Sequence, residues 1–169
     1  HFTLAKVYSK VKNFYVKNDT LRYSRGGNNE SVLVPTNKNT FQMLDVPSDL
    51  NVRFENENGQ KRMIVSMNNE NPSTFEGYIP PNYSQQELQQ FTGTFYSEEL
   101  STTYTLMVKD NKLVATHPRN SDITITPVKQ DLFSGNKWFF SSILFERNQS
   151  TSITGIRVSS GRVMGLYFK

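Results

Sequence analysis

Cysteine is absent from this sequence, and histidine occurs only at His1 and His117. The lack of cysteine excludes disulfides and thiolate metal sites, although it leaves the redox compartment open. A metal centre needs several ligands at defined spacings, which two distant histidines do not supply. No stretch approaches the ~18 apolar residues of a membrane-spanning helix. The sequence therefore predicts no metal site, no cofactor and no membrane span.

A concentration of charge of one sign is also missing. The net charge is +4, but residues 1–85 carry 10 basic and 8 acidic groups, and residues 86–169 carry 9 and 7. Nucleic-acid-binding proteins gather lysine and arginine on one face or in one run. The even distribution argues against a nucleic-acid partner, and we interpret the basic isoelectric point as a contribution to solubility.

The first residue is His1 rather than methionine, and no charged segment followed by an apolar leader opens the chain. We expect a fragment or a processed form whose parent protein carries an export signal upstream. The length of 169 residues suits one ordinary domain or two very small ones.

The sequence contains an internal repeat. Residues 14–43 and 106–135 align without a gap at an offset of 92. The identical pairs are Val16 and Val108, Lys17 and Lys109, Leu21 and Leu113, Asn28 and Asn120, Pro35 and Pro127, and Phe41 and Phe133. Beyond this window the copies slip by one residue, so that Phe54 falls opposite Phe145. Such repetition predicts a tandem architecture; the alternative is one irregular meander with coincidental turns.

Both copies are predicted to consist of short antiparallel strands. Polar and apolar residues alternate in Thr103–Lys109, which is the period of a half-buried strand. We expect first-copy strands over residues 12–16, 21–24, 32–34, 41–44, 51–55, 61–67 and 74–79. We expect second-copy strands from Thr94 onward, over residues 103–109, 112–116, 123–126, 138–140, 143–146, 153–158 and 162–168. A meander of this kind curls or closes, because closure removes exposed strand edges.

The segment between the copies breaks the β pattern. The diproline at 80–81 cannot continue a strand ladder. Ser84 precedes Glu87 by three residues, as in a capping box, and Leu88 and Phe91 lie one turn apart. We predict an extended spacer followed by one short helix of about two turns.

These patterns predict an all-β fold of tandem antiparallel meanders with one short linker helix. The first β repeat covers residues 1–80, the linker 81–92 and the second repeat 93–169. The first repeat lacks the Gly-Thr-Phe-Tyr entry of the second, which is consistent with truncation at the N-terminus.

No catalytic constellation is complete. A serine nucleophile activated by a lysine three residues later needs both on one helical turn. Ser9 and Lys12 fall in an expected strand, and Ser134 and Lys137 fall in an expected turn. The carboxylates of Glu98-Glu99 are adjacent in an expected strand and would point to opposite faces, which defeats paired acid and base work. We predict that this chain is not an enzyme.

Four residues remain as candidates for a binding site, namely His117, Arg119, Asn120 and Trp138. The first three follow a strand in a polar loop that would lie at a barrel mouth. The aromatic residues at strand positions are expected to pack in the core. The expected aromatic core residues are Phe95, Tyr96, Tyr104, Trp138, Phe139, Phe140, Phe145, Tyr167 and Phe168. Because each copy has only about eighty residues, we expect side chains to fill the interior.

Residues Leu88–Lys169 resemble a known module. The resembling elements are the "TGTFYSEEL" entry strand, the "VKDNKL" hairpin, "HPRN", the segment from Pro127 to Phe133, "FERN" and the closing "GRVMGLYFK". The sequence looks like the C-terminal β module that follows the catalytic domain in bacterial serine hydrolases of the class C β-lactamase and penicillin-binding-protein superfamily. The first copy joins this resemblance only through its similarity to the second.

The resemblance implies lipocalin-like small barrels that pack on the hydrolase domain of the same parent chain, in the periplasm or outside the cell. It implies no activity, because the catalytic residues of that superfamily lie in a different domain. We therefore expect a non-catalytic accessory module that limits access to the hydrolase site. The alternative is a free-standing lipocalin-like carrier of a small ligand, with a cavity lined by Tyr104, Trp138 and Phe145.

Overall fold

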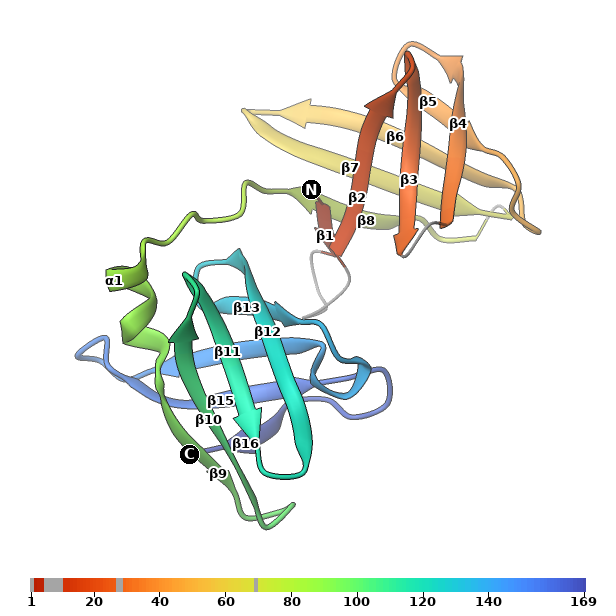
Figure 1. Cartoon of the computed structure of the whole chain (residues 1–169). Helices are drawn as coiled ribbons and strands as arrows, with labels where there is room; N and C mark the ends of the chain where they lie inside the picture. The colour runs from red at the N-terminus through yellow and green to blue at the C-terminus, as the bar shows by residue number, and fades with distance from the viewer. Residues whose placement is uncertain (1, 5–10, 27–28, 69) are drawn as a thin grey trace. The chain divides into compact units, whose positions relative to one another are not determined.

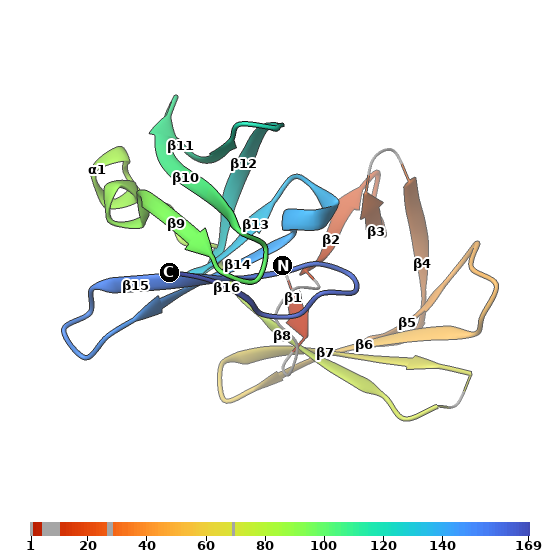
Figure 2. The same ribbon diagram turned by 90° about the horizontal axis from the view of Figure 1, so that it is seen from below.

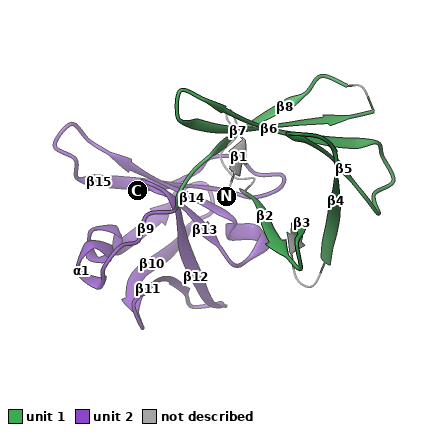
Figure 3. Cartoon of the chain, turned by 90° about the horizontal axis from the view of Figure 1, so that it is seen from above, with its two compact units in different colours: residues 1–79 green, residues 80–169 purple. Residues whose placement is uncertain are grey.

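The computed structural model describes residues 2–4, 11–26, 29–68 and 70–169. Its elements are almost all strands, so the predicted all-β fold of tandem antiparallel meanders is confirmed. The chain divides into two compact units, His1–Ile79 and Pro80–Lys169, which are coloured separately in Figure 3.

The first unit is a closed barrel. Its strands are β1 (Phe2–Leu4), β2 (Val11–Lys17), β3 (Thr20–Gly26), β4 (Asn29–Asn37), β5 (Thr40–Met43), β6 (Leu50–Glu57), β7 (Gln60–Met67) and β8 (Ser73–Gly77). Each strand pairs antiparallel with the next, and β1 also pairs with β8 (Figure 1). Closure leaves no long strand edge exposed among these elements.

The second unit is an eight-stranded antiparallel sheet in sequence order. Its strands are β9 (Gly93–Ser97), β10 (Thr102–Lys109), β11 (Lys112–His117), β12 (Asn120–Lys129), β13 (Leu132–Gly135), β14 (Ser142–Arg147), β15 (Ile153–Ser159) and β16 (Leu166–Phe168). The two outer strands meet, because Tyr96 of β9 and Lys169, just after β16, exchange backbone hydrogen bonds of 2.9 and 2.8 Å.

The two units share their strand register. Pro35 pairs with Phe41 as Pro127 pairs with Phe133, and the same register shift follows each proline. Val16 likewise pairs with Leu21 as Val108 pairs with Leu113. The pairs of the next strands differ by the predicted slip, since Phe41 faces Val52 whereas Phe133 faces Ile143. Of the identical pairs in the alignment, Asn28 lies outside the described residues.

Equivalent turns explain this common register. Asn18 and Asp19 join β2 to β3 with φ of 51° and 56°, and Asp110 and Asn111 join β10 to β11 with φ of 51° and 57°. Two consecutive left-handed residues make the type I′ turn, whose twist matches that of paired strands. Asparagine and aspartate tolerate this conformation better than other non-glycine residues.

Three details of the predicted strands are wrong. Residues 138–140 form a short 3₁₀ helix, η2 (Trp138–Phe140), rather than a strand. The last strand is shorter than predicted, because residues 162–165 belong to the connection before β16. In addition, β13 continues to Gly135, where a turn was expected.

The predicted linker helix is confirmed as α1 (Gln85–Leu88), followed by the 3₁₀ turn η1 (Gln89–Phe91). The Ser84 amide donates to the Glu87 carboxylate at 2.7 Å, and the Glu87 amide donates to the Ser84 hydroxyl at 3.2 Å. Leu88 and Phe91 are buried in the core of the second unit. The helix therefore belongs to that unit and leads into β9 (Figure 2).

Arg147 fastens this helical segment to the sheet. Its guanidinium donates to the Asp131 carboxylate at 2.7 Å and to the Gln90 side-chain oxygen at 2.8 Å. It also lies 5.5 Å from the centroid of the Phe91 ring, within reach of a cation–π interaction. The hydrogen bonds to Asp131 raise the pKa of the Arg147 side chain.

The two cores differ in content. In the second unit the interior contains Phe133 and Phe145 from the sheet, Phe91 from η1 and Phe140 from η2, all nearly inaccessible to solvent. Among the described residues of the first unit, the buried core consists of Leu33, Met43, Val52, Met63 and Phe75. Burying a side chain of this size contributes about 1.5–3 kcal/mol, so the second unit has the larger apolar stabilisation.

Candidate functional site

The four candidate residues lie at one end of the second unit. His117 ends β11, Arg119 lies in the following turn, and Asn120 begins β12. Trp138 begins η2, in the connection between β13 and β14. In an up-and-down meander, alternate connections share an end of the sheet, so these two connections lie at the end opposite to the β10–β11 turn.

His117, Arg119 and Asn120 form a hydrogen-bonded turn. The Arg119 amide donates to His117 Nδ1 at 3.0 Å, so this nitrogen carries no proton, and Nε2 lies 2.7 Å from the Thr102 hydroxyl. The Asn120 amide group lies 3.2 Å from His117 Nδ1 and donates to the Tyr104 hydroxyl at 3.3 Å. Because protein groups occupy both ring nitrogens, His117 organises the turn and offers no nitrogen to a metal.

Tyr104 connects this turn to the apolar interior. Its ring lies 4.8 Å from the His117 ring and 4.7 Å from the Phe140 ring, between centroids. Burial raises the pKa of the Tyr104 hydroxyl, which therefore stays protonated at neutral pH and accepts from Asn120. Tyr104 thus contacts the turn through His117 and lines the same hollow as Trp138.

Trp138 is exposed, contrary to the expectation that it packs in the core. Its side chain is 81% accessible and touches the Phe139 ring edge-on, with 5.7 Å between centroids. It borders an apolar hollow of about 260 Å³ at the same end of the unit. The hollow is lined by Glu99, Leu100, Tyr104, Trp138, Phe139, Phe140, Val158, Ser160, Val163, Leu166 and Phe168.

Other large apolar side chains are exposed around this hollow. Leu100 is 53% accessible and Val163 is 48% accessible, and both line the hollow. Together with Trp138 they form a group that we call the rim cluster. Single exposed apolar residues are common, whereas a contiguous group that includes a tryptophan is typical of a protein contact surface.

The expected cavity between Tyr104, Trp138 and Phe145 is not formed. Tyr104 and Trp138 both line the hollow, but Phe145 lies deep in the core. The Phe145 ring contacts Phe91 and Phe133 at 4.8 and 5.2 Å between centroids, toward the end covered by η1. The interior around Phe145 is therefore filled by side chains, which was the expectation for both repeats.

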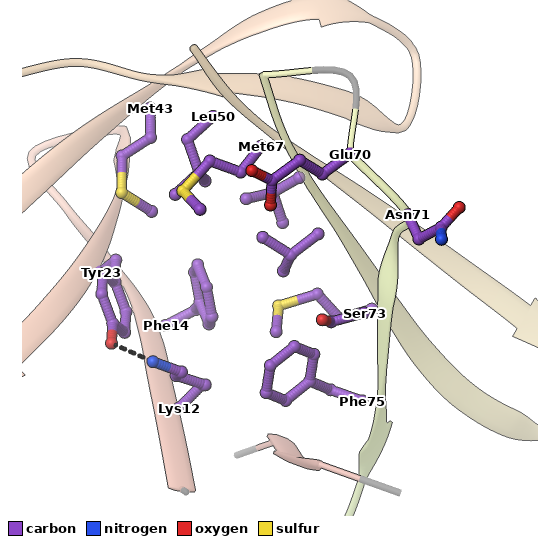
Figure 4. A pocket seen from close by; sticks show the side chains of 13 residues that line it. Lys12, Phe14, Tyr23, Met43, Leu50, Met67, Glu70, Asn71, Ser73 and Phe75 are labelled. Carbon is purple, nitrogen blue, oxygen red and sulfur yellow. Dashed lines mark hydrogen bonds between the residues drawn. The ribbon is translucent and has the colours of Figure 1, made fainter. Parts of the chain in front are cut away.

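The first unit contains a pocket that the sequence analysis did not predict. It has a volume of about 190 Å³ and lies inside the barrel (Figure 4). Most of its wall is apolar, and three of its residues are methionines. The lining residues are Lys12, Phe14, Tyr23, Met43, Leu50, Val52, Met63, Val65, Met67, Glu70, Asn71, Ser73 and Phe75.

One cation lies on the wall of this pocket. Lys12 Nζ donates a hydrogen bond of 2.9 Å to the Tyr23 hydroxyl and lies 5.2 Å from the centroid of the Tyr23 ring (Figure 4). Phe14 stacks on the Tyr23 ring at 5.1 Å between centroids and contacts Phe54 edge-on at 5.6 Å. Glu70 is exposed in the connection between β7 and β8 and supplies the acidic group of the lining.

Comparison of the repeats shows how the described interiors differ next to β5 and β13. Gly135 lies where the first repeat has Met43, and a Cβ on Gly135 would lie 2.0 Å from the Phe140 carbonyl oxygen. The missing side chain lets η2 approach, so that Phe140 fills the second interior. The connection over residues 44–49 of the first repeat contains no aromatic residue, and no Phe140 equivalent enters.

Of the two serine–lysine pairs, only Ser134 and Lys137 lie wholly within the described residues, and no hydrogen bond joins their side chains there. Ser9 lies outside the described residues, and Lys12 bonds to Tyr23. The Ser134 hydroxyl donates to the Ser141 carbonyl oxygen at 3.2 Å. The pair Glu98-Glu99 lies in the turn after β9 rather than in a strand.

The described part of the chain contains neither a cluster of metal ligands nor a helix that could span a membrane. Within residues 2–4, 11–26, 29–68 and 70–169, no three His, Cys, Asp or Glu side chains are grouped so that they could hold a metal ion. No helix in those ranges has the length and apolar character needed to cross a bilayer.

No family model matches this chain, and no curated protein matches it significantly. Its assignment to a function therefore depends on the sites described above, and the similarity to hydrolase-associated modules remains a hypothesis.

The pocket had a weak signal in the sequence. Met43, Met63 and Met67 line the pocket from β5 and β7. The corresponding residues of the second repeat are Gly135, Ile156 and Ser160, and none of them is a methionine. Methionine adapts to irregular spaces and is common at apolar binding surfaces. The size of the space could not be predicted, because it depends on what the other strands and connections contribute.

Proposed function

We propose that this chain is a non-catalytic accessory module that docks on a protein domain through the rim cluster of its second unit. The observation that carries the proposal is Trp138, which is 81% exposed beside an apolar hollow. Tryptophan is enriched among residues that dominate protein interfaces, and a hollow beside it can receive a partner side chain.

The proposed partner is the catalytic domain of a serine hydrolase related to class C β-lactamases and penicillin-binding proteins, in the same parent chain. The motifs of residues 88–169 support this choice. Docking of the rim cluster beside the hydrolase site would limit substrate access, and the parent protein would be periplasmic or secreted.

The first test is the coding sequence that precedes this chain in its gene. A helical domain with an S-x-x-K nucleophile is expected in the same reading frame. A reading frame without it would remove the proposed partner.

Thiol labelling gives the second test, because the chain has no cysteine of its own. The thiol introduced by Val163→Cys lies in the rim cluster, and that of Met107→Cys lies on the outer face of β10, where Met107 is 40% exposed. In the parent protein we expect labelling at position 163 to slow at least about tenfold relative to this chain alone, whereas labelling at 107 stays unchanged.

Adding Trp138→Ser to the Val163→Cys protein should restore fast labelling, because it removes the central anchor. Equal labelling at position 163 in the parent and in this chain would contradict docking through the rim cluster.

The alternative, a free-standing lipocalin-like carrier of a small ligand, is favoured by the pocket in the first unit. The two functions use different units, so a chain can have either or both.

A further inference from the structure

Among the described residues, the pocket of the first unit combines apolar walls with one lysine, Lys12. Phe14, Val52, Met63 and Phe75 are apolar lining residues from β2, β6, β7 and β8. Lys12 is partly buried on β2, where the second repeat has Tyr104 in the equivalent position. A ligand site is typically apolar, with a few polar groups that fix the orientation of the ligand.

Among the described residues, Lys12 and Tyr23 retain donor capacity for a ligand. An ammonium group has three N–H donors, and the bond to Tyr23 uses one of them. Tyr23 accepts that bond, so its own hydroxyl proton is directed elsewhere. Both groups therefore offer hydrogen bonds to an acceptor, and a carboxylate would accept from both with the added strength of opposite charge.

The volume limits the size of the apolar part of the ligand. The pocket measures about 190 Å³, and a dry apolar cavity of about 150 Å³ is known to take up benzene. One six-membered ring or a short branched alkyl group fits within this volume, whereas a longer or fused apolar group would extend out of the pocket.

We propose that the first barrel binds a small monocarboxylate with one aromatic or branched alkyl group. The carboxylate accepts hydrogen bonds from Lys12 and Tyr23, and the apolar group lies among Met43, Met63 and Phe75. This site is independent of the proposed docking function, because the rim cluster belongs to the other unit.

The lining also contains an acidic residue, Glu70, so the preferred charge of the ligand can be tested. Glu70 is exposed in the β7–β8 connection, whereas Lys12 is partly buried and held by Tyr23. Figure 4 shows the Glu70 and Lys12 side chains on different parts of the lining. An amine ligand would use Glu70, and a carboxylate ligand uses Lys12, so matched probes of both charges distinguish the two.

The methyl signals of the methionines allow ligand binding to be measured. Three of the five, Met43, Met63 and Met67, line the pocket, and Met107 and Met164 belong to the second unit. With ¹³C-methyl-methionine in the full chain, we expect benzoate to shift the three pocket methyl signals saturably and to leave Met107 and Met164 unchanged. Benzyl alcohol is the neutral probe and benzylamine the cationic one.

Lys12→Met shortens the unbranched side chain by one atom and removes its charge. It should weaken benzoate binding at least about tenfold, the effect of losing one charge-assisted hydrogen bond, and change benzyl alcohol binding little. Lys61→Met is the matched control, because Lys61 is exposed on β7 of the same barrel. Val65→Phe reduces the pocket and should weaken both probes.

Three results would overturn the proposal. These are the absence of saturable shifts at the pocket methionines of the unaltered chain, tighter binding of benzylamine than of benzoate, and equal benzoate affinity for the unaltered chain and Lys12→Met. The first result needs no substitution, so a variant that fails to fold does not prevent the test.

Discussion

Tyr96 and Lys169 donate backbone hydrogen bonds to each other's carbonyl oxygens, at 2.9 and 2.8 Å. Their counterparts in the first unit are Thr3 and Glu76, which pair where β1 meets β8. Both pairs are related by an offset of 93 residues. The two repeats are therefore closed at the same place in the meander, although their interiors differ.

Hydrogen exchange should detect closure of the second unit. We expect the amides of Tyr96 and Lys169 to be protected together, because each bond depends on the other strand staying in place. The amide of Glu99, in the turn after β9, is a suitable fast-exchanging reference. Exchange of Lys169 at the rate of Glu99 would show that the outer strands separate in solution.

Removal of the Arg147 guanidinium should loosen the helical segment. Arg147→Met leaves the Asp131 carboxylate without its main partner, at a site where the two side chains are only 21% and 19% exposed. We expect a loss of about 1–3 kcal/mol in the free energy of unfolding, measured by urea denaturation.

Lys109→Met is the control for this variant. Lys109 pairs with Asp122 at 3.3 Å, but these side chains are 59% and 51% exposed, so the expected loss is about 0–1 kcal/mol. Similar losses in the two variants would contradict the role assigned to Arg147.

Gly135→Ala should displace η2. The new methyl group would lie 2.0 Å from the Phe140 carbonyl oxygen, and we expect a loss of about 1–3 kcal/mol in the free energy of unfolding. Gly161→Ala is the matched substitution, because a Cβ there meets no atom within 4 Å. Its expected effect is within about 0.5 kcal/mol. Equal unfolding midpoints would show that η2 adapts without cost.

Tyr78 should make stability depend on alkaline pH. Burial raises the pKa of its hydroxyl to about 12, from the ordinary value of 10.0. The folded state thus favours the protonated form, and this contribution is fully present below about pH 10 and is lost as the pH rises toward about 12. Tyr78→Phe should lose less stability over that interval than the unaltered chain, as measured by urea denaturation at both ends. A parallel loss in the two proteins would remove Tyr78 as the cause.

The hairpins could be predicted from sequence because their determinants are local. The polar pairs Asn18-Asp19 and Asp110-Asn111 specify tight turns, and alternation of apolar residues specifies which strand face is buried. The capping box between Ser84 and Glu87 is local too. The slip at Phe54 came from the alignment of the repeats rather than from these local signals.

The environment of Trp138 could not be predicted in this way. The sequence Trp-Phe-Phe has strand-like composition, but the chain turns there because Gly135 admits the Phe140 carbonyl group. That contact is visible only when β13 and η2 are placed together. The sequence predicts one polar loop for His117, Arg119 and Asn120, and they lie in one turn of the structure. Their polar groups bond mainly to one another.

The size of the first-unit pocket depends on the volumes of side chains at many positions. The aligned window ends on Met43 and Gly135, which differ more in size than most aligned pairs. That difference alone favours a fuller first barrel. The opposite holds because Phe140 and Phe91 enter the second interior from outside the aligned strands.

Trp138 is the only tryptophan among the chain's aromatic residues, which include eight tyrosines. Its exposure places the indole in a polar solvent shell, so its fluorescence should emit at long wavelength and be readily quenched by acrylamide. A blue shift would then report the covering of one end of one barrel, in a chain that needs no added dye.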